Sequence, residues 1–184
     1  MNKTKALALS GLFAALAVIC LILADTLLIN SSGFCFIIAA FLCGYTAELS
    51  KMPFGIGCAA AAFLLGLIIS PYKLHCLTFL GLAVFILICQ YILQRSRTDK
   101  PLGRIKAWII TILSWNVFLA AGIALYSIFI GNISELTAGT VFDSTPLPLF
   151  IALMIIVLEA LGPVIYIAYG QFINFMDRIV RRIL

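Results

Sequence analysis

Long apolar stretches alternate with short polar segments along the whole of this chain. The apolar stretches run roughly over 6–29, 33–50, 53–70, 74–94, 106–131 and 146–171. Each is close to the roughly 17–25 residues that a helix needs to cross about 30 Å of hydrocarbon. The pattern therefore predicts an all-α, polytopic membrane protein, with residues 1–184 folded as one bundle of six transmembrane helices.

The basic residues predict which way this bundle faces. If the six stretches cross the membrane in alternating directions, one side of the membrane receives eleven of the twelve Lys and Arg residues. These are Lys3, Lys5, Lys51, Arg95, Arg97, Lys100, Arg104, Lys106, Arg178, Arg181 and Arg182. Lys73 falls on the other side. Because the cytoplasmic side of a membrane protein carries an excess of Lys and Arg, both termini are expected in the cytoplasm.

The composition leaves little room for a soluble domain, since 64% of the residues are apolar and the mean hydropathy is +1.20. The pI is about 9.0, but the basic residues lie at helix ends, where anionic lipid headgroups account for them. We therefore expect this charge to face the lipid bilayer, and we expect no nucleic acid as a partner.

The sequence lacks the common motifs of catalysis and metal binding. The cysteines are scattered through the apolar stretches without C-x-x-C spacing, as expected of packing residues rather than of a disulfide or zinc framework: Cys20, Cys35, Cys43, Cys58, Cys76 and Cys89. No G-x-x-x-x-G-K-[ST], G-x-S-x-G or H-E-x-x-H motif is present. We expect no enzyme activity, no cofactor and no metal site, so any ATP-driven step must come from another subunit.

Two polar residues are expected near the middle of the membrane. Asn116 lies about ten residues into the fifth stretch and Glu159 about thirteen into the sixth, so the two can face each other. An ionisable group at that depth must face the bundle interior or a wet cavity. The pair predicts either a polar contact for a captured ligand or a hydrogen bond that joins the last two helices.

Further polar residues gather at the outer edge. Asp25 and Asn30 lie at the outer end of the first stretch, and His75 opens the fourth. With Trp115 as an aromatic wall, they can rim an outward-facing pocket for a small molecule. The predicted substrate-binding residues are therefore Asp25, Asn30, His75, Trp115, Asn116 and Glu159.

The inner end of the second stretch carries Glu48 and Lys51, which are three residues apart. On a helix this spacing predicts a local ion pair. Pro53 follows directly and can start the next helix without losing a needed N–H group. The second and third stretches should therefore form a tight hairpin.

Small residues form a strip on the first stretch. Ala6, Ser10 and Ala14 recur at intervals of four residues, with Gly11 and Ala15 beside them. Small side chains let another helix approach closely, which drives helix association in lipid. The strip predicts close packing, either against another helix of this chain or against a partner protein.

The N-terminal sequence KTKALALSGLFAALAVICLIL and the segment FIIAAFLCGY…PFGIGCAAAAFLLGLIISP resemble the substrate-binding S components of energy-coupling-factor vitamin transporters. The resemblance covers nearly the whole chain. It implies a bacterial cell-membrane protein that captures a vitamin or another small organic micronutrient in an outward-facing pocket. It also implies partners, a T component and two ATPase subunits, that supply the energy for import.

In that family an A-x-x-x-A motif on the first helix docks the T component. The corresponding strip here is Ala6, Ser10, Gly11, Ala14 and Ala15, and the strict motif is absent. A membrane scaffold of the MreD type, which holds cell-shape or cell-envelope proteins, is the alternative. A proton-coupled secondary transporter is a third hypothesis, although no internal repeat supports it.

Overall fold

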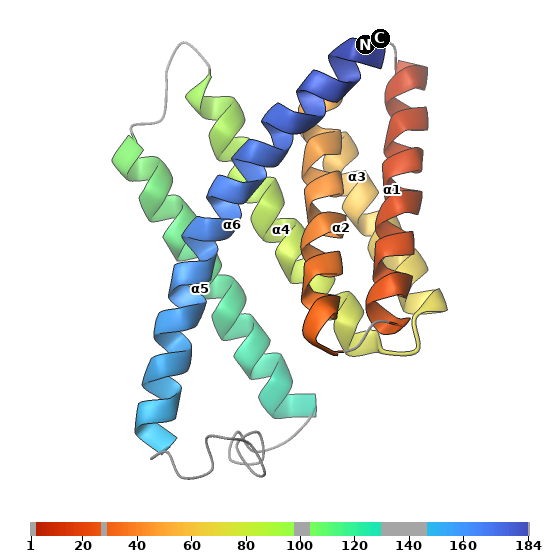
Figure 1. Ribbon diagram of the computed structural model, residues 1–184. Helices are drawn as coiled ribbons and strands as arrows, with labels where there is room; N and C mark the ends of the chain where they lie inside the picture. The colour runs from red at the N-terminus through yellow and green to blue at the C-terminus, as the bar shows by residue number, and fades with distance from the viewer. Residues whose placement is uncertain (1–2, 27–28, 98–103, 130–146, 184) are drawn as a thin grey trace.

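The computed structural model describes residues 3–26, 29–97, 104–129 and 147–183, which fold into helices joined by short turns (Figure 1). The helices are α1 (Lys3–Thr26), α2 (Ile29–Leu49), α3 (Met52–Ile69), α4 (Lys73–Ser96), α5 (Arg104–Phe129) and α6 (Leu147–Ile183). Successive helices run in opposite directions, so α1 begins and α6 ends at the same end of the molecule. No strand occurs in the described ranges, which confirms the predicted all-α class.

Within the described residues, four helices contain a segment that is long and apolar enough to cross a membrane. These segments are Thr4–Thr26, Met52–Ile69, His75–Ser96 and Ile105–Gly122. In α2 the apolar segment Gly33–Leu49 is shorter. The protein is thus helical, and the length and apolar composition of several of its helices are compatible with a membrane-spanning protein.

The last helix is longer than the apolar pattern predicts. The sequence predicts an end near residue 171, whereas α6 continues to Ile183. In the added part, Ile173 is buried, and Phe172 and Met176 pack half-buried against the core. The helix continues because one apolar face still packs on the bundle after the uninterrupted apolar run has ended.

α2 is the centre of the bundle and packs against α1, α3 and α4. All its residues over 36–47 are buried or half-buried, and Ala39 and Ala40 expose no surface. Such small side chains let the neighbouring backbones approach closely. Four of the six cysteines lie buried in the core as free thiols, as predicted for packing residues: Cys43, Cys58, Cys76 and Cys89.

α5 and α6 form a second layer beside the first four helices. α5 packs against α4 and α6, and α6 crosses the face of the molecule diagonally (Figure 1). The second half of α6 reaches α2, where the Tyr169 and Phe41 ring centroids lie 5.2 Å apart. Phe172 packs on the same Phe41 ring at 5.3 Å. These aromatic contacts hold the long last helix against the centre of the bundle.

Candidate functional site

Asn116 and Glu159 meet between α5 and α6. The Asn116 Nδ2 atom donates to Glu159 Oε2 at 3.4 Å and to the backbone oxygen of Ile112 at 3.0 Å. Each residue stands about 18 Å along its helix from the first residue, which places Asn116 near the middle of α5. The contact predicted between them is therefore present. Asn116 is exposed and Glu159 is half-buried, and no cation among the described residues pairs with this carboxylate.

Trp115 points away from this pair and into the bundle. Its ring centroid lies 4.9 Å from that of Phe85 and 5.3 Å from that of Phe118, and only 3% of the residue is exposed. Gly162 of α6 lies against the indole, because a Cβ atom there would be 2.7 Å from Trp115 Cγ. Trp115 thus packs inside the bundle in this structure, and its role as the wall of an outward-facing pocket stays a prediction. The indole is buried where three helices pack, since only a glycine lets α6 come so close.

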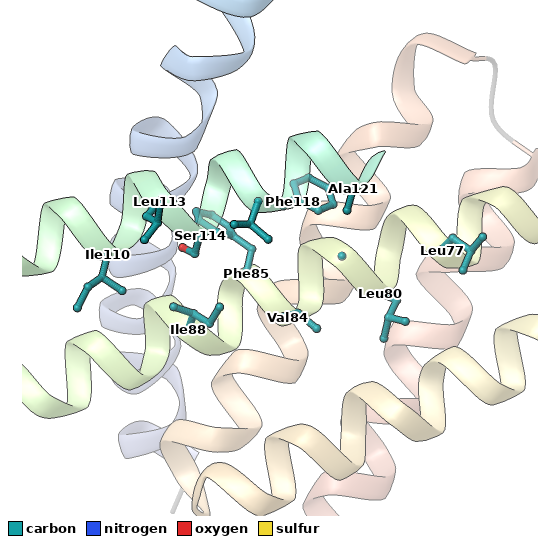
Figure 2. A pocket seen from close by; sticks show the side chains of 12 residues that line it. Leu77, Leu80, Val84, Phe85, Ile88, Ile110, Leu113, Ser114, Phe118 and Ala121 are labelled. Atoms are coloured by element: carbon teal, nitrogen blue, oxygen red, sulfur yellow. The ribbon is translucent and has the colours of Figure 1, made fainter. Parts of the chain in front are cut away.

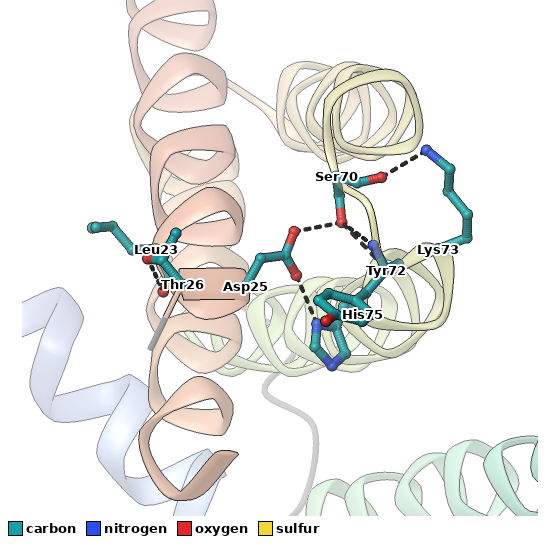
Figure 3. A network of polar contacts seen from close by, with 7 residues as sticks. All are labelled: Leu23, Asp25, Thr26, Ser70, Tyr72, Lys73 and His75. Atoms are coloured by element: carbon teal, nitrogen blue, oxygen red, sulfur yellow. Dashed lines mark hydrogen bonds and ion pairs between the residues drawn. The ribbon is translucent and has the colours of Figure 1, made fainter. Parts of the chain in front are cut away.

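Asp25, Ser70 and His75 form a polar cluster where the ends of α1 and α3 meet the start of α4 (Figure 3). The Asp25 Oδ1 atom lies 2.7 Å from His75 Nδ1, and Ser70 Oγ donates to Asp25 Oδ2 at 2.5 Å. The Asp25 side chain is only 4% exposed, while that of His75 is 35% exposed. Asp25 and His75 therefore do meet at one level, but both carboxylate oxygens are already engaged within the protein.

The turn between α3 and α4 holds this cluster in place. The Tyr72 N–H group donates to Ser70 Oγ at 3.2 Å, and the Tyr72 ring packs 5.3 Å from the His75 ring. The Lys73 ammonium donates to the backbone oxygens of Ser70, at 2.7 Å, and of Leu67. Positive charge is favourable at the last carbonyls of a helix, so Lys73 stabilises the end of α3.

A third polar group, which the sequence analysis missed, joins the end of α2 to the second half of α4 and the middle of α6. Gln90 is fully buried; its Nε2 atom donates to Glu48 Oε2, and its Oε1 atom accepts from the Tyr169 hydroxyl at 2.8 Å. The other Glu48 oxygen forms an ion pair with Arg97 at 2.5 Å. The predicted Glu48–Lys51 pair is wrong, because α2 ends before Lys51 and the helical spacing is lost. The amide of Gln90 inside an apolar stretch was the available signal, since a buried amide requires partners.

The structure divides the predicted substrate-binding residues between two places. Asp25 lies at the end of α1 and His75 at the start of α4, whereas Trp115, Asn116 and Glu159 lie between α5 and α6. No hydrogen bond or ion pair between described residues joins the two groups. The remaining predicted residue, Asn30, lies in the first turn of α2, and the surroundings of its side chain are not among the described features.

The small-residue strip of α1 also divides. Ala6 and Ala14 are buried against the bundle, and Ser10 is half-buried with its hydroxyl bonded to the backbone of its own helix. Gly11 and Ala15 are exposed, and a Cβ atom added to Gly11 would meet nothing within 4 Å. The first pair thus makes the internal contact, while the second faces outward.

Comparison with known proteins adds no relative to this picture. No protein-family model, no curated protein and no solved structure matches the chain. Function must therefore be argued from the arrangement of the residues.

Proposed function

We propose that this chain is the membrane-embedded, substrate-binding subunit of an energy-coupling-factor type importer. It captures a vitamin or another small organic micronutrient from outside the cell, and a T component with ATPase subunits supplies the energy. In this proposal all six helices cross the plasma membrane of a bacterium, with both termini in the cytoplasm. The all-helical fold with alternating helix directions and the sequence resemblance over α1 to α3 support it.

The pair of Asn116 and Glu159 is the observation that carries the proposal. Glu159 is the acidic or basic residue that lies nearest the middle of an apolar stretch anywhere in the sequence. An ionised side chain at the bilayer centre costs about 2.5–3.5 kcal/mol on insertion scales. The pair is partly exposed, and its one mutual hydrogen bond is long, at 3.4 Å. A polar group from outside the described residues is therefore needed to cover it, and a captured ligand supplies one.

Five of the six predicted residues have a role in this proposal. Glu159 accepts hydrogen bonds from the ligand or pairs with a positively charged group on it. The Asn116 amide fixes the orientation of the Glu159 carboxylate. The buried Trp115 positions Asn116 by anchoring α5 between α4 and α6. Asp25 and His75 close the outer end of α1, α3 and α4 rather than contacting the ligand in this conformation.

Native mass spectrometry of the protein purified in mild detergent tests this proposal. We expect a retained molecule of vitamin-like mass in the wild-type protein. Glu159→Gln and Asn116→Ala should each weaken its retention at least ten-fold while the melting temperature of the empty protein stays unchanged. Asn174→Ala, an exposed amide on the same helix α6, is the matched control and should bind as the wild type does.

The opposite pattern contradicts a ligand contact at this pair. If Glu159→Gln lowers the melting temperature of the empty and loaded protein equally and leaves retention unchanged, the pair only joins α5 to α6.

A membrane scaffold of the MreD type is the second candidate. The observation that favours it is the outer cluster, where Asp25 is satisfied by Ser70 and His75 instead of lining an open pocket. A scaffold requires a filled core and partner proteins on its sides. Purified protein that carries no small molecule, but brings cell-shape proteins with it, would establish the scaffold instead.

A further inference from the structure

The face of α4 that points away from α2 carries two apolar grooves that the proposed function does not use. The first, between α4 and α5, has a volume of about 540 Å³ and runs from Leu77 and Ala121 to Ile88 and Ile110 (Figure 2). The second, between α3 and α4, has a volume of about 410 Å³ and is lined by Met52, Ile56, Val84, Leu87, Ile88 and Tyr91. Val84 and Ile88 line both grooves, so the two grooves lie on either side of one ridge.

Both grooves are suited to hydrocarbon rather than to a polar molecule. In the first, Ser114 is the one side chain with a hydroxyl, and this hydroxyl donates to the backbone oxygen of Thr111 at 3.0 Å. In the second, Tyr91 alone carries a polar side-chain atom. A pair of apolar grooves on either side of a ridge matches a ligand with two hydrocarbon chains.

Positive charge lies at the inner ends of both grooves. Lys106 stands one turn before Ile110 on the same face of α5, and Lys51 directly precedes Met52. Both lysines are exposed, and Tyr91 on α4 is exposed at the same end. Glu48, the acidic residue close by on α2, is held by Arg97 and Gln90. Basic residues at the cytoplasmic interface attract anionic headgroups, and tyrosine is typical of this level of the membrane.

The distances along the helices fit one lipid leaflet. From Lys106 to Val117, which lines the first groove, α5 advances about 16 Å. This is about half of the roughly 30 Å of hydrocarbon in a bilayer. A chain whose headgroup lies beside Lys106 can therefore extend along the first groove to mid-depth and beyond.

We propose that this face of α4 binds an anionic glycerophospholipid from the leaflet next to Lys51 and Lys106. One acyl chain lies in each groove, on either side of Val84 and Ile88, and the phosphate lies at the end of the ridge that Lys51 and Lys106 flank. The site is independent of the pair of Asn116 and Glu159, because neither residue lines a groove.

Lipid titration tests the headgroup contact. Delipidated protein is titrated with dioleoyl phosphatidylglycerol or dioleoyl phosphatidylcholine, which carry the same chains, and bound lipid is counted by native mass spectrometry. We expect phosphatidylglycerol to bind at least ten-fold more tightly. Lys51→Gln and Lys106→Gln should each lower its affinity about five-fold and leave phosphatidylcholine unaffected. Lys5→Gln removes an exposed charge near the start of α1 and should leave the affinity for both lipids unchanged.

A second variant tests the grooves. Val84 is 50% exposed and lines both grooves, so Val84→Trp should lower the affinity for both lipids at least ten-fold. Leu64→Trp on α3, where the leucine is 58% exposed and lines neither groove, is the matched control. Thermal unfolding of each variant verifies that it is folded, and Val84→Phe replaces Val84→Trp if the latter is not.

Three results would overturn the lipid site. They are equal binding of the two lipids, unchanged phosphatidylglycerol affinity after loss of both lysines, and wild-type binding by a folded Val84 variant. Release of a co-purifying membrane protein by Val84→Trp, with lipid binding unchanged, would assign the grooves to a partner helix instead. Glu159→Gln should bind lipid as the wild type does, so failure of the ligand proposal and failure of the lipid proposal are distinguishable.

Discussion

Gly44→Ala should destabilise the bundle, because no space exists for a methyl group where α2 meets α4 and α6. A Cβ atom at Gly44 would lie 2.6 Å from Ile86 Cγ2 and 2.8 Å from Tyr169 Cζ, with the Tyr169 hydroxyl also in its way. Ordinary contact between carbon atoms requires about 3.5–4.0 Å, so these groups must separate by about 1 Å. Ile86 and Tyr169 are both fully buried, and neither can move toward the surface without disturbing the core.

The expected magnitude follows from two opposing terms. Overpacking of a core costs about 1–3 kcal/mol. Alanine in place of glycine inside a helix returns about 0.5–1 kcal/mol. The free energy of unfolding should therefore fall by about 1–2 kcal/mol. SDS titration of the purified protein in mixed micelles, followed by circular dichroism, measures this change.

Gly57→Ala on α3 is the matched control. A Cβ atom at Gly57 would meet nothing within 4 Å, so this variant should be as stable as the wild type or slightly more stable. In a Tyr169→Phe background, Gly44→Ala should cost less than in the wild type, because the obstructing hydroxyl has gone. Equal stability of the Gly44 and Gly57 variants would refute the close approach of α2 to Tyr169.

Two further predictions concern the hydrogen bonds of Gln90 and the exposed face of α1 that carries Gly11 and Ala15. Tyr169→Phe leaves the buried Oε1 atom of Gln90 without its hydroxyl donor and should lower the free energy of unfolding by about 1–3 kcal/mol, whereas the exposed Tyr91→Phe should not. The same SDS titration decides between them. Ala15→Leu should abolish co-purification with a T component while the isolated protein stays folded, because Ala15 faces outward. Ala14→Leu should instead lower the free energy of unfolding by about 1–3 kcal/mol, since Ala14 is buried. Undiminished recovery of the complex with Ala15→Leu would exclude this docking face.

Part of the candidate site followed from the sequence because it depended on depth alone. Asn116 and Glu159 lie near the middle of neighbouring antiparallel apolar stretches, so their contact could be predicted from residue counts. The contact of Asp25 with His75 followed in the same way, since Asp25 stands near the end of α1 and His75 near the start of α4. The orientation of Trp115 did not follow, because it depends on the close approach of α6 at Gly162.

The sequence by itself determined that the chain forms apolar helices, roughly where they begin and end except for the end of α6, and how far along its apolar stretch each polar residue lies. Hydrophobicity and helical rise suffice for these features. Only the tertiary structure decided which face of each helix packs, as the division of Ala14 from Ala15 and the burial of Gln90 demonstrate. In a soluble helix the apolar stripe marks the buried face, but lipid is as apolar as a protein core. The faces toward lipid and toward the bundle therefore read alike in the sequence, and close packing alone distinguishes them.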